Sequence, residues 1–353
     1  MHGGNIISGI DIDFSVSLNP YTDNRISALI ETAIKEGTDD AIRYPDIAQT
    51  AVRAAIAFSS GTIPECVIAG NGSSELIMAL VRALSPKTAL LTEPCFTGYR
   101  YALGTVPGCD IRVCRLHKED GFEMTEDILS CMTNKTDLLF LCDPGNPSGR
   151  NIDEELLVRI LERAYELGIS VLLDESFYML SDKCDKYTYE KRAKHCDQFP
   201  NLYILRSYTK CFALPGIRMG YLMSSPENIK MIRKHLPEWN LSSISSALMR
   251  RLSEVRELSQ FLEKSRDFIR NERSFLSESL SGLGFCVYKS DSNYLLFESR
   301  YDNSVKSTYE KCIERGLLIR VCDDFDGLGP DYHRVSVRSH EDNEQLISAL
   351  GSF

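Results

Sequence analysis

A single lysine, Lys210, lies in a stretch whose residue types suit a nucleophilic amine. The stretch 207–221 follows the apolar run 202–205, which has the character of a buried strand. Because Lys210 is flanked by apolar side chains such as Phe212 and Leu214, we expect it to be partly buried. Burial lowers the pKa of a lysine and frees its amine as a nucleophile. The alternative is a solvated lysine in a surface turn, and three further segments argue against it.

Groups suited to bind phosphate lie near this lysine in the sequence and again near residue 70. Arg218, Ser207 and Thr209 supply the hydrogen-bond donors that a phosphate requires. The segment 67–80 is typical of a strand, a glycine turn and a helix, so it places backbone amides at a helix N-terminus, where anions bind readily. These are the amides of Gly72, Ser73 and Ser74. A dinucleotide-binding fingerprint is not satisfied, because Glu75 stands where its third glycine is needed. A plain helix cap is the alternative for this segment.

Two more polar residues follow apolar runs that are typical of buried parallel strands. Asn146 comes after the run 137–142, and Asp174 directly follows the run 171–173. In a parallel α/β sheet the ligand lies at the carboxyl ends of the strands. Since Lys210 also follows such a run, we expect one cleft to collect all three side chains.

Together these residues suit pyridoxal 5′-phosphate. The carboxylate of Asp174 would keep the pyridine nitrogen protonated and strengthen the ring as an electron sink, and Asn146 would donate to the 3′ oxygen. Phe96 either covers the face of the ring or packs in the core. Lys210 would carry the cofactor covalently, yield it to the substrate amine and then shuttle protons. The 5′ phosphate would be bound by the donors named above.

The composition is that of a soluble globular protein. The chain has 353 residues, 43% of them hydrophobic and 25% charged, and it is long enough for two or three domains. A net charge of −10 argues against non-specific nucleic-acid binding, and no apolar run approaches the ~20 residues that span a bilayer. We expect a cytoplasmic protein without nucleic-acid or membrane partners. The 12 cysteines include no CxxC pair and none near a histidine pair at zinc-ligand spacing, so we assign no metal and no disulfide.

In combination, the motifs resemble fold-type-I pyridoxal-phosphate enzymes of the histidinol-phosphate aminotransferase branch. They are the segments 43–46, 70–75, 146–149, 174–175 and 207–221, and the resemblance covers nearly the whole chain. It implies an α/β fold, with a large domain whose mostly parallel sheet lies between helices and a smaller α+β domain. It also implies a homodimer with shared active sites, because in that family Tyr44 reaches the cofactor phosphate of the neighbouring subunit.

Within this branch the chain resembles the threonine-phosphate decarboxylases most, through residues 2–5, 13–20 and 318–339. This implies decarboxylation of O-phospho-L-threonine, or a close amino-acid phosphate, to (R)-1-aminopropan-2-yl phosphate and carbon dioxide in cobalamin biosynthesis. Phe177 agrees, since the aminotransferases usually carry a tyrosine there that bonds the 3′ oxygen. Ser17 and Gly145 each replace an asparagine that is usual in the family. Either replacement leaves an altered substrate, such as phosphoserine, open.

The substrate of such an enzyme carries a carboxylate and a phosphate, and both suit planar guanidinium groups. The candidate ligands are Arg320, Arg334 and Arg338, with ordinary surface ion pairing as the alternative. Arg334 and Arg338 are four residues apart, so on a regular strand both would point to the same face. The resemblance adds His2, as a phosphate ligand, and Asn19.

Three functions stay open from the sequence: a lyase, an aminotransferase of the histidinol-phosphate type, and a non-catalytic cofactor-binding or regulatory protein. The same side chains serve the first two, and the orientation of the substrate decides between them. The third is disfavoured, because the chain retains Lys210 and no DNA-binding segment is attached.

The expected organisation is a large cofactor-binding domain over 45–225, with 1–44 and 226–353 forming an N-terminal arm and a small C-terminal α+β domain. In the small domain we expect a long helical stretch over 242–280, broken inside, and further helices over 305–315 and 342–350. Its expected strands are 285–288, 294–297, 317–320 and 334–338.

Overall fold

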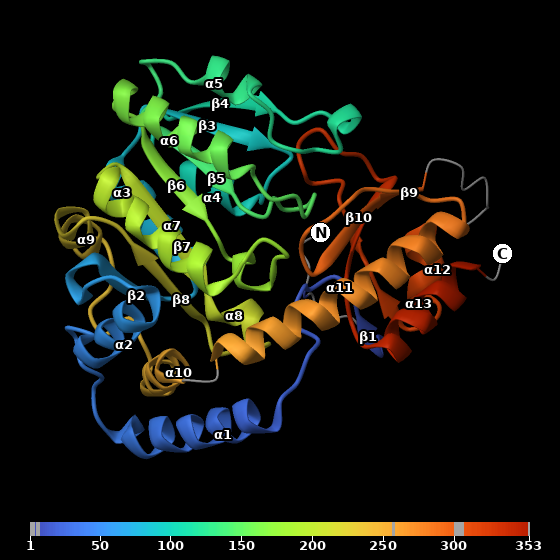
Figure 1. Cartoon of the computed structure of the whole chain (residues 1–353), viewed down its shortest axis with the longest axis horizontal. Coiled ribbons are helices and arrows are strands. Elements are labelled where there is room, and N and C mark those ends of the chain that lie inside the picture. Colours follow the sequence, from blue (N-terminus) through green and yellow to red (C-terminus); the bar gives the residue numbers. More distant parts are fainter. Residues whose placement is uncertain (1–3, 5–7, 256–257, 300–306, 352–353) are drawn as a thin grey trace.

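The structure is a computed structural model that describes residues 4, 8–255, 258–299 and 307–351. Figure 1 shows a larger body built on one sheet and a smaller body built on a second sheet, with the long helix α11 reaching from one to the other. None of the helices described is long and apolar enough to cross a membrane.

The large body is organised by a seven-stranded sheet with the strand order β2-β8-β7-β6-β5-β3-β4. All neighbouring strands are parallel except at β8, which runs antiparallel to β2 and β7. This confirms the expected mostly parallel sheet. The strands are β2 (Val67–Asn71), β3 (Thr88–Glu93), β4 (Asp110–Arg115), β5 (Leu138–Cys142), β6 (Ser170–Asp174), β7 (Leu202–Ser207) and β8 (Met219–Met223).

Helices cover both faces of this sheet, which explains why its central strands are continuous apolar runs. One face carries α3 (Ser73–Leu84), α4 (Gly98–Leu103) and α9 (Pro226–Arg233). The other carries α2 (Thr50–Ser60), α6 (Glu154–Leu167), α7 (Lys186–Gln198) and α10 (Ser243–Glu254), and α1 (Asn24–Asp39) packs on α10. Two short helices are α5 (Asp127–Cys131) and α8 (Tyr208–Cys211).

Helix α6 illustrates how local sequence sets these elements. The side chain of Asp153 accepts hydrogen bonds from the first free amides of the helix, and Gly168 ends it with a φ of 71°. Between them, Leu157, Ile160 and Ala164 lie on one buried stripe against the sheet. The cap, the buried stripe and the glycine together set the bounds and the packing of α6.

The small body has an antiparallel sheet with the order β12-β13-β10-β9. Its strands are β9 (Cys286–Val287), β10 (Tyr294–Glu298), β12 (Arg320–Val321) and β13 (Tyr332–Ser336). Its helices are α11 (Leu258–Gly282), α12 (Thr308–Ile313) and α13 (His340–Gly351). The N-terminal strand β1 (Ile12–Asp13) pairs with β11 (Leu317–Leu318), so the start of the chain is fastened to this body. Helix α11 joins the two cores, with Ile269 in the large core and Leu276 in the small one.

Two expectations about the C-terminal part are refined. The helical stretch over 242–280 is broken after Glu254, between α10 and α11. The strand expected over 334–338 is wrong at its end, because β13 stops at Ser336. Beyond it the amide of Arg338 donates to the side chain of Asn343 in α13 at 3.1 Å. The division of the chain at 44–45 and 225–226 stays a prediction.

A buried network of ion pairs ties together the carboxyl ends of β5, β6 and β7. The fully buried side chain of Arg192 on α7 contacts Asp143 at 2.5 Å, Glu154 at 2.7 Å and Glu175 at 3.1 Å. Glu175 also accepts from Arg206 of β7 at 2.6 Å. Because all of these charges except Glu154 lie out of water, each of them depends on its partners.

We expect Arg192→Met to lower the free energy of unfolding by about 3–5 kcal/mol, because it leaves buried carboxylates without a counter-charge. Urea unfolding followed by circular dichroism measures this loss. The matched control is Arg159→Met, whose ion pair with Glu126 is solvent-exposed and should matter little. Equal small changes in the two variants would contradict the importance of the network.

Candidate active site

A cavity of about 610 Å³ opens at the carboxyl ends of the parallel strands, and both bodies line it. The large body contributes strand ends and helix starts, while Arg320, Phe325 and Arg334 come from the small body and Ser15 from the N-terminal segment. This volume suits a small-molecule ligand. The cavity is where a parallel sheet is expected to bind its ligand.

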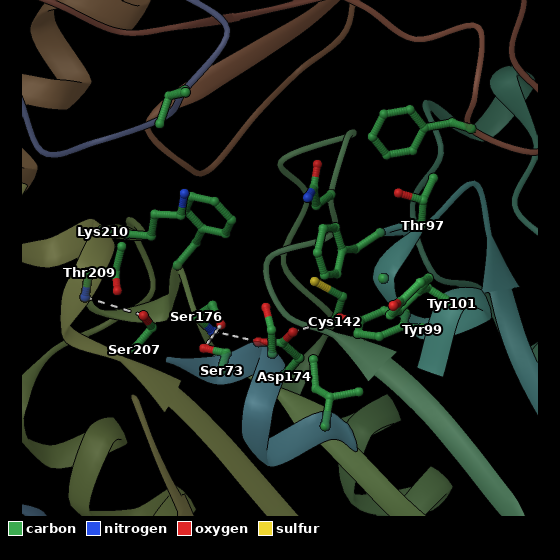
Figure 2. Close-up of a pocket in the computed structure, with 18 of the residues that line it drawn as sticks. Ser73, Thr97, Tyr99, Tyr101, Cys142, Asp174, Ser176, Ser207, Thr209 and Lys210 are labelled. Atoms are coloured by element: carbon green, nitrogen blue, oxygen red, sulfur yellow. Dashed lines mark hydrogen bonds between the residues drawn. The ribbon is translucent and has the colours of Figure 1, made fainter. Parts of the chain in front are cut away.

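Lys210 projects its amine into this cavity from α8, directly after β7 (Figure 2). Ser207 begins that helical turn by accepting a hydrogen bond from the amide of Thr209 at 3.2 Å. Burial lowers the pKa of Lys210 to about 8; the positive charges of Arg334 and Arg218 act in the same direction, and Asp174 opposes them. A substantial fraction of the amine is therefore neutral near pH 8, as a nucleophile requires.

Asp174 lies on the floor of the cavity at the end of β6 (Figure 2). Its carboxylate accepts from the Tyr99 hydroxyl at 2.7 Å and from the amide of Ser176 at 2.9 Å. Burial raises the pKa of Asp174, and these two hydrogen bonds act against that rise. A cationic N–H beside the carboxylate would favour its charged form further, which is the role expected of a protonated pyridine nitrogen.

The predicted phosphate donors come together from three separate elements. Ser73 and Ser74 begin α3, Ser207 and Thr209 lie around the turn of Lys210, and Arg218 precedes β8; all line the cavity. Gly72 has a φ of 82°, and a Cβ there would lie 2.5 Å from a guanidinium nitrogen of Arg218. Glycine is therefore required for the backbone and Arg218 to approach each other, and the resulting cradle fits a phosphate.

Arg334 fixes the orientation of Asn146. Its guanidinium is buried, and it donates to the Asn146 side-chain oxygen at 2.5 Å and to the Ser15 carbonyl at 2.9 Å. The side-chain oxygen of Asn146 accepts from Arg334. The NH₂ group of Asn146 is therefore left to donate, which suits the 3′ oxygen attached to a pyridine ring. Phe96 is half-buried at the cavity wall and meets Tyr99 edge-to-face at 5.5 Å.

Besides Gly72, which lies beside Arg218, four predicted ligands are not among the described residues that line the cavity. Arg338 pairs with Asp342 at 2.8 Å and with the Asp13 carbonyl, because β13 ends before it. Asn19 donates from its backbone amide to the Lys210 carbonyl at 2.9 Å and from its side chain to the Cys211 carbonyl, so it supports the lysine turn. Tyr44 is 81% exposed and packs on Trp239. His2 lies outside the described residues.

The structure also places residues in the cavity that sequence reasoning missed. Tyr99 and Ser176 bind the Asp174 carboxylate, Cys142 lines the floor, and Phe325 lines the wall from the small body. The contact between Tyr99 and Asp174 joins residues 75 positions apart, and no local sequence pattern predicts it. The sequence offered only a weak indication for Ser176, which lies two residues after the carboxylate at the end of β6.

The cavity therefore holds what pyridoxal 5′-phosphate requires. A buried amine with a lowered pKa, a carboxylate on the floor and a cradle of amides, hydroxyls and one guanidinium all face the same space. Lys210 and Asp174 both line this cavity, and they follow or end the neighbouring parallel strands β7 and β6.

Comparisons with known proteins agree with this geometry. The family model described as aminotransferase class I and II matches residues 10–350. The threonine-phosphate decarboxylase of Salmonella typhimurium is 31% identical, covering 99% of this chain and 95% of that protein. The histidinol-phosphate aminotransferase of Methanosphaera stadtmanae is 28% identical, covering 90% of this chain and 84% of that protein.

The fold is shared with solved structures. The histidinol-phosphate aminotransferase from Clostridium acetobutylicum superposes with a TM-score of 0.85 at 24% identity, over 96% of this chain and 98% of that chain. This confirms the fold-type-I architecture expected from the motifs. The chain belongs to the aminotransferase class I and II family of pyridoxal-phosphate-dependent enzymes.

Proposed function

We propose that this enzyme decarboxylates O-phospho-L-threonine, or a close amino-acid phosphate, to (R)-1-aminopropan-2-yl phosphate and carbon dioxide, as a step of cobalamin biosynthesis. The observation that carries the proposal is the pair of arginines, Arg320 and Arg334, that line the same cavity as Lys210. A substrate with two anionic groups matches them. Similarity to the Salmonella protein over nearly the whole chain supports the same reaction.

In this proposal the chain's own residues bind the cofactor and position it. Lys210 would hold the cofactor covalently, Asp174 would bind its ring nitrogen, and Asn146 would donate to its 3′ oxygen. The donors available to its phosphate would be Ser73, Ser74, Ser207, Thr209, Arg218 and the Gly72 backbone. When bound, pyridoxal 5′-phosphate supplies an electron-withdrawing ring that accepts the electron pair of the bond that breaks.

The remaining task of the protein is to choose that bond. Arg320 and Arg334 would bind the two anionic groups of the substrate and so fix its orientation, and Lys210, with its lowered pKa, would hold the proton that replaces carbon dioxide. Phe177 faces the Lys210 amine, with its ring centroid 5.5 Å away. Because phenylalanine carries no hydroxyl, it cannot donate to the 3′ oxygen as the tyrosine of most aminotransferases does.

The second candidate is an aminotransferase, in which Lys210 removes the α-proton instead. It is favoured by the relatives named histidinol-phosphate aminotransferase, which match most of the chain at about the same level of identity. The residues of the cavity serve this reaction equally, so the product has to distinguish the two.

We further propose a homodimer and a cytoplasmic location. The exposed side chains of Ile42, Tyr44 and Phe58 form part of a surface that a second copy would cover, and the resemblance brings Tyr44 to the partner's cofactor phosphate. All 12 cysteines have free thiols, which fits a reducing compartment.

The proposed reaction predicts release of carbon dioxide from O-phospho-L-threonine without a 2-oxo acid. Lys210→Ala should release none while it unfolds at the same urea concentration as the wild type within error. Incubation with and without 2-oxoglutarate, measuring carbon dioxide and new amino acid, tests this. Turnover that needs the oxo acid and releases no carbon dioxide would establish the aminotransferase instead.

The lowered pKa of Lys210 predicts a distinct pH profile in the cofactor-free protein. Only the neutral amine reacts with an acylating reagent, so labelling of Lys210 should rise with pH and be half-maximal near pH 8. An ordinary lysine would be half-labelled at about pH 10.4.

Arg334→Gln removes a positive charge near Lys210, so in this variant the pH of half-maximal labelling should be higher. Peptide mass spectrometry measures the labelling, with the exposed Lys35 as internal standard. A wild-type profile still rising steeply at pH 10 would contradict the burial of the amine.

A further inference from the structure

One of the three arginines that line the cavity, Arg320, already binds an anion supplied by the chain. A terminal nitrogen of Arg320 donates to both carboxylate oxygens of Asp324, at 2.6 and 2.7 Å. The other terminal nitrogen donates to the Val321 carbonyl at 2.9 Å, and the Arg320 side chain is only 4% exposed. A substrate anion can therefore reach this guanidinium only by sharing it with Asp324 or replacing it.

The segment that carries Asp324 is held in place by contacts other than Arg320. Asp326 accepts hydrogen bonds from Arg100 of α4 at 2.7 Å and from Arg115 of β4 at 3.2 Å, so it fastens the segment to the large body. Between the two aspartates, Phe325 lines the cavity and lies 5.2 Å from the Arg320 guanidinium. The fold thus presents the carboxylate of Asp324 to Arg320 at the edge of the cavity.

The charge of Asp324 is maintained in this position. Burial acts to raise the pKa of Asp324, but the hydrogen bonds and charge of Arg320 outweigh it and lower the pKa below its ordinary value. The carboxylate is therefore ionised at neutral pH. It supplies the counter-charge to a guanidinium that lies almost out of water.

We propose that Asp324 is an internal competitor for the substrate's phosphate, and that it sets how tightly the cavity binds a phosphate ester. The proposal rests on the proposed function in taking a phosphate ester as the ligand of Arg320. A phosphate ester carries a charge of about −1.5 to −2 at neutral pH. It can displace a carboxylate with a single charge, whereas a ligand without a comparable charge cannot.

The test uses the cofactor-loaded protein, whose own phosphate site is filled, and isopropyl phosphate, which lacks the amine needed for reaction. Calorimetry should show that Asp324→Asn binds isopropyl phosphate about tenfold more tightly than the wild type, equivalent to about 1.4 kcal/mol. Asp342→Asn is the matched control: it breaks the other arginine–aspartate pair at a spacing of four residues, with Arg338, outside the cavity. Its affinity should equal that of the wild type.

A double-mutant cycle separates competition from a general structural effect. In the Arg320→Gln background, Asp324→Asn should no longer change the affinity, because the guanidinium over which the anions compete is gone. Unchanged or weaker binding in Asp324→Asn alone would overturn the proposal, as would a gain that persists without Arg320. Since this readout is binding, a protein that binds isopropyl phosphate as expected but releases no carbon dioxide would refute the proposed reaction and leave the competitor role intact.

Discussion

The constraint on which the site depends is a concentration of positive charge around one amine. Among the described residues that line the cavity, Lys210, Arg218, Arg320 and Arg334 are cationic and Asp174 is the carboxylate, in a chain whose net charge is −10. Such a concentration of like charge in a partly buried site is unfavourable. Burial, together with the charges of Arg334 and Arg218, lowers the pKa of Lys210, and the cluster of cations makes the cavity a receptor for anions. The cofactor phosphate and the anionic groups of the substrate are the ligands that balance it.

The sheet brings these charges together, and the ion pairs beneath it keep them in place. Strands β6 and β7 are parallel neighbours, so Asp174 and the turn of Lys210 leave the sheet at the same edge. Directly after Asp174, Glu175 is bound by Arg192 and Arg206. The carboxylate of Glu175 thus anchors the strand end that presents Asp174, while Asn19 supports the turn of Lys210 from the N-terminal segment.

The sequence was informative where function depends on local chemistry at the end of a strand. Lys210, Asp174, Asn146 and the phosphate donors were predictable, because an apolar run followed by a polar residue marks each strand end. Contacts between distant segments were not predictable. No local pattern shows that Tyr99 binds Asp174, 75 residues further along the chain. Arg338 was misplaced because the alternation argument assumed two more residues of strand than β13 has.

The central claim is that one pyridine ring lies between Lys210 and Asp174. A crystal structure of the protein with pyridoxal 5′-phosphate tests it most directly. We predict continuous density from the Lys210 side chain to the cofactor, the ring nitrogen within hydrogen-bond distance of the Asp174 carboxylate, and the phosphate between Gly72 and Arg218. Density joining the cofactor to another lysine, or a ring nitrogen that faces away from Asp174, would contradict this placement.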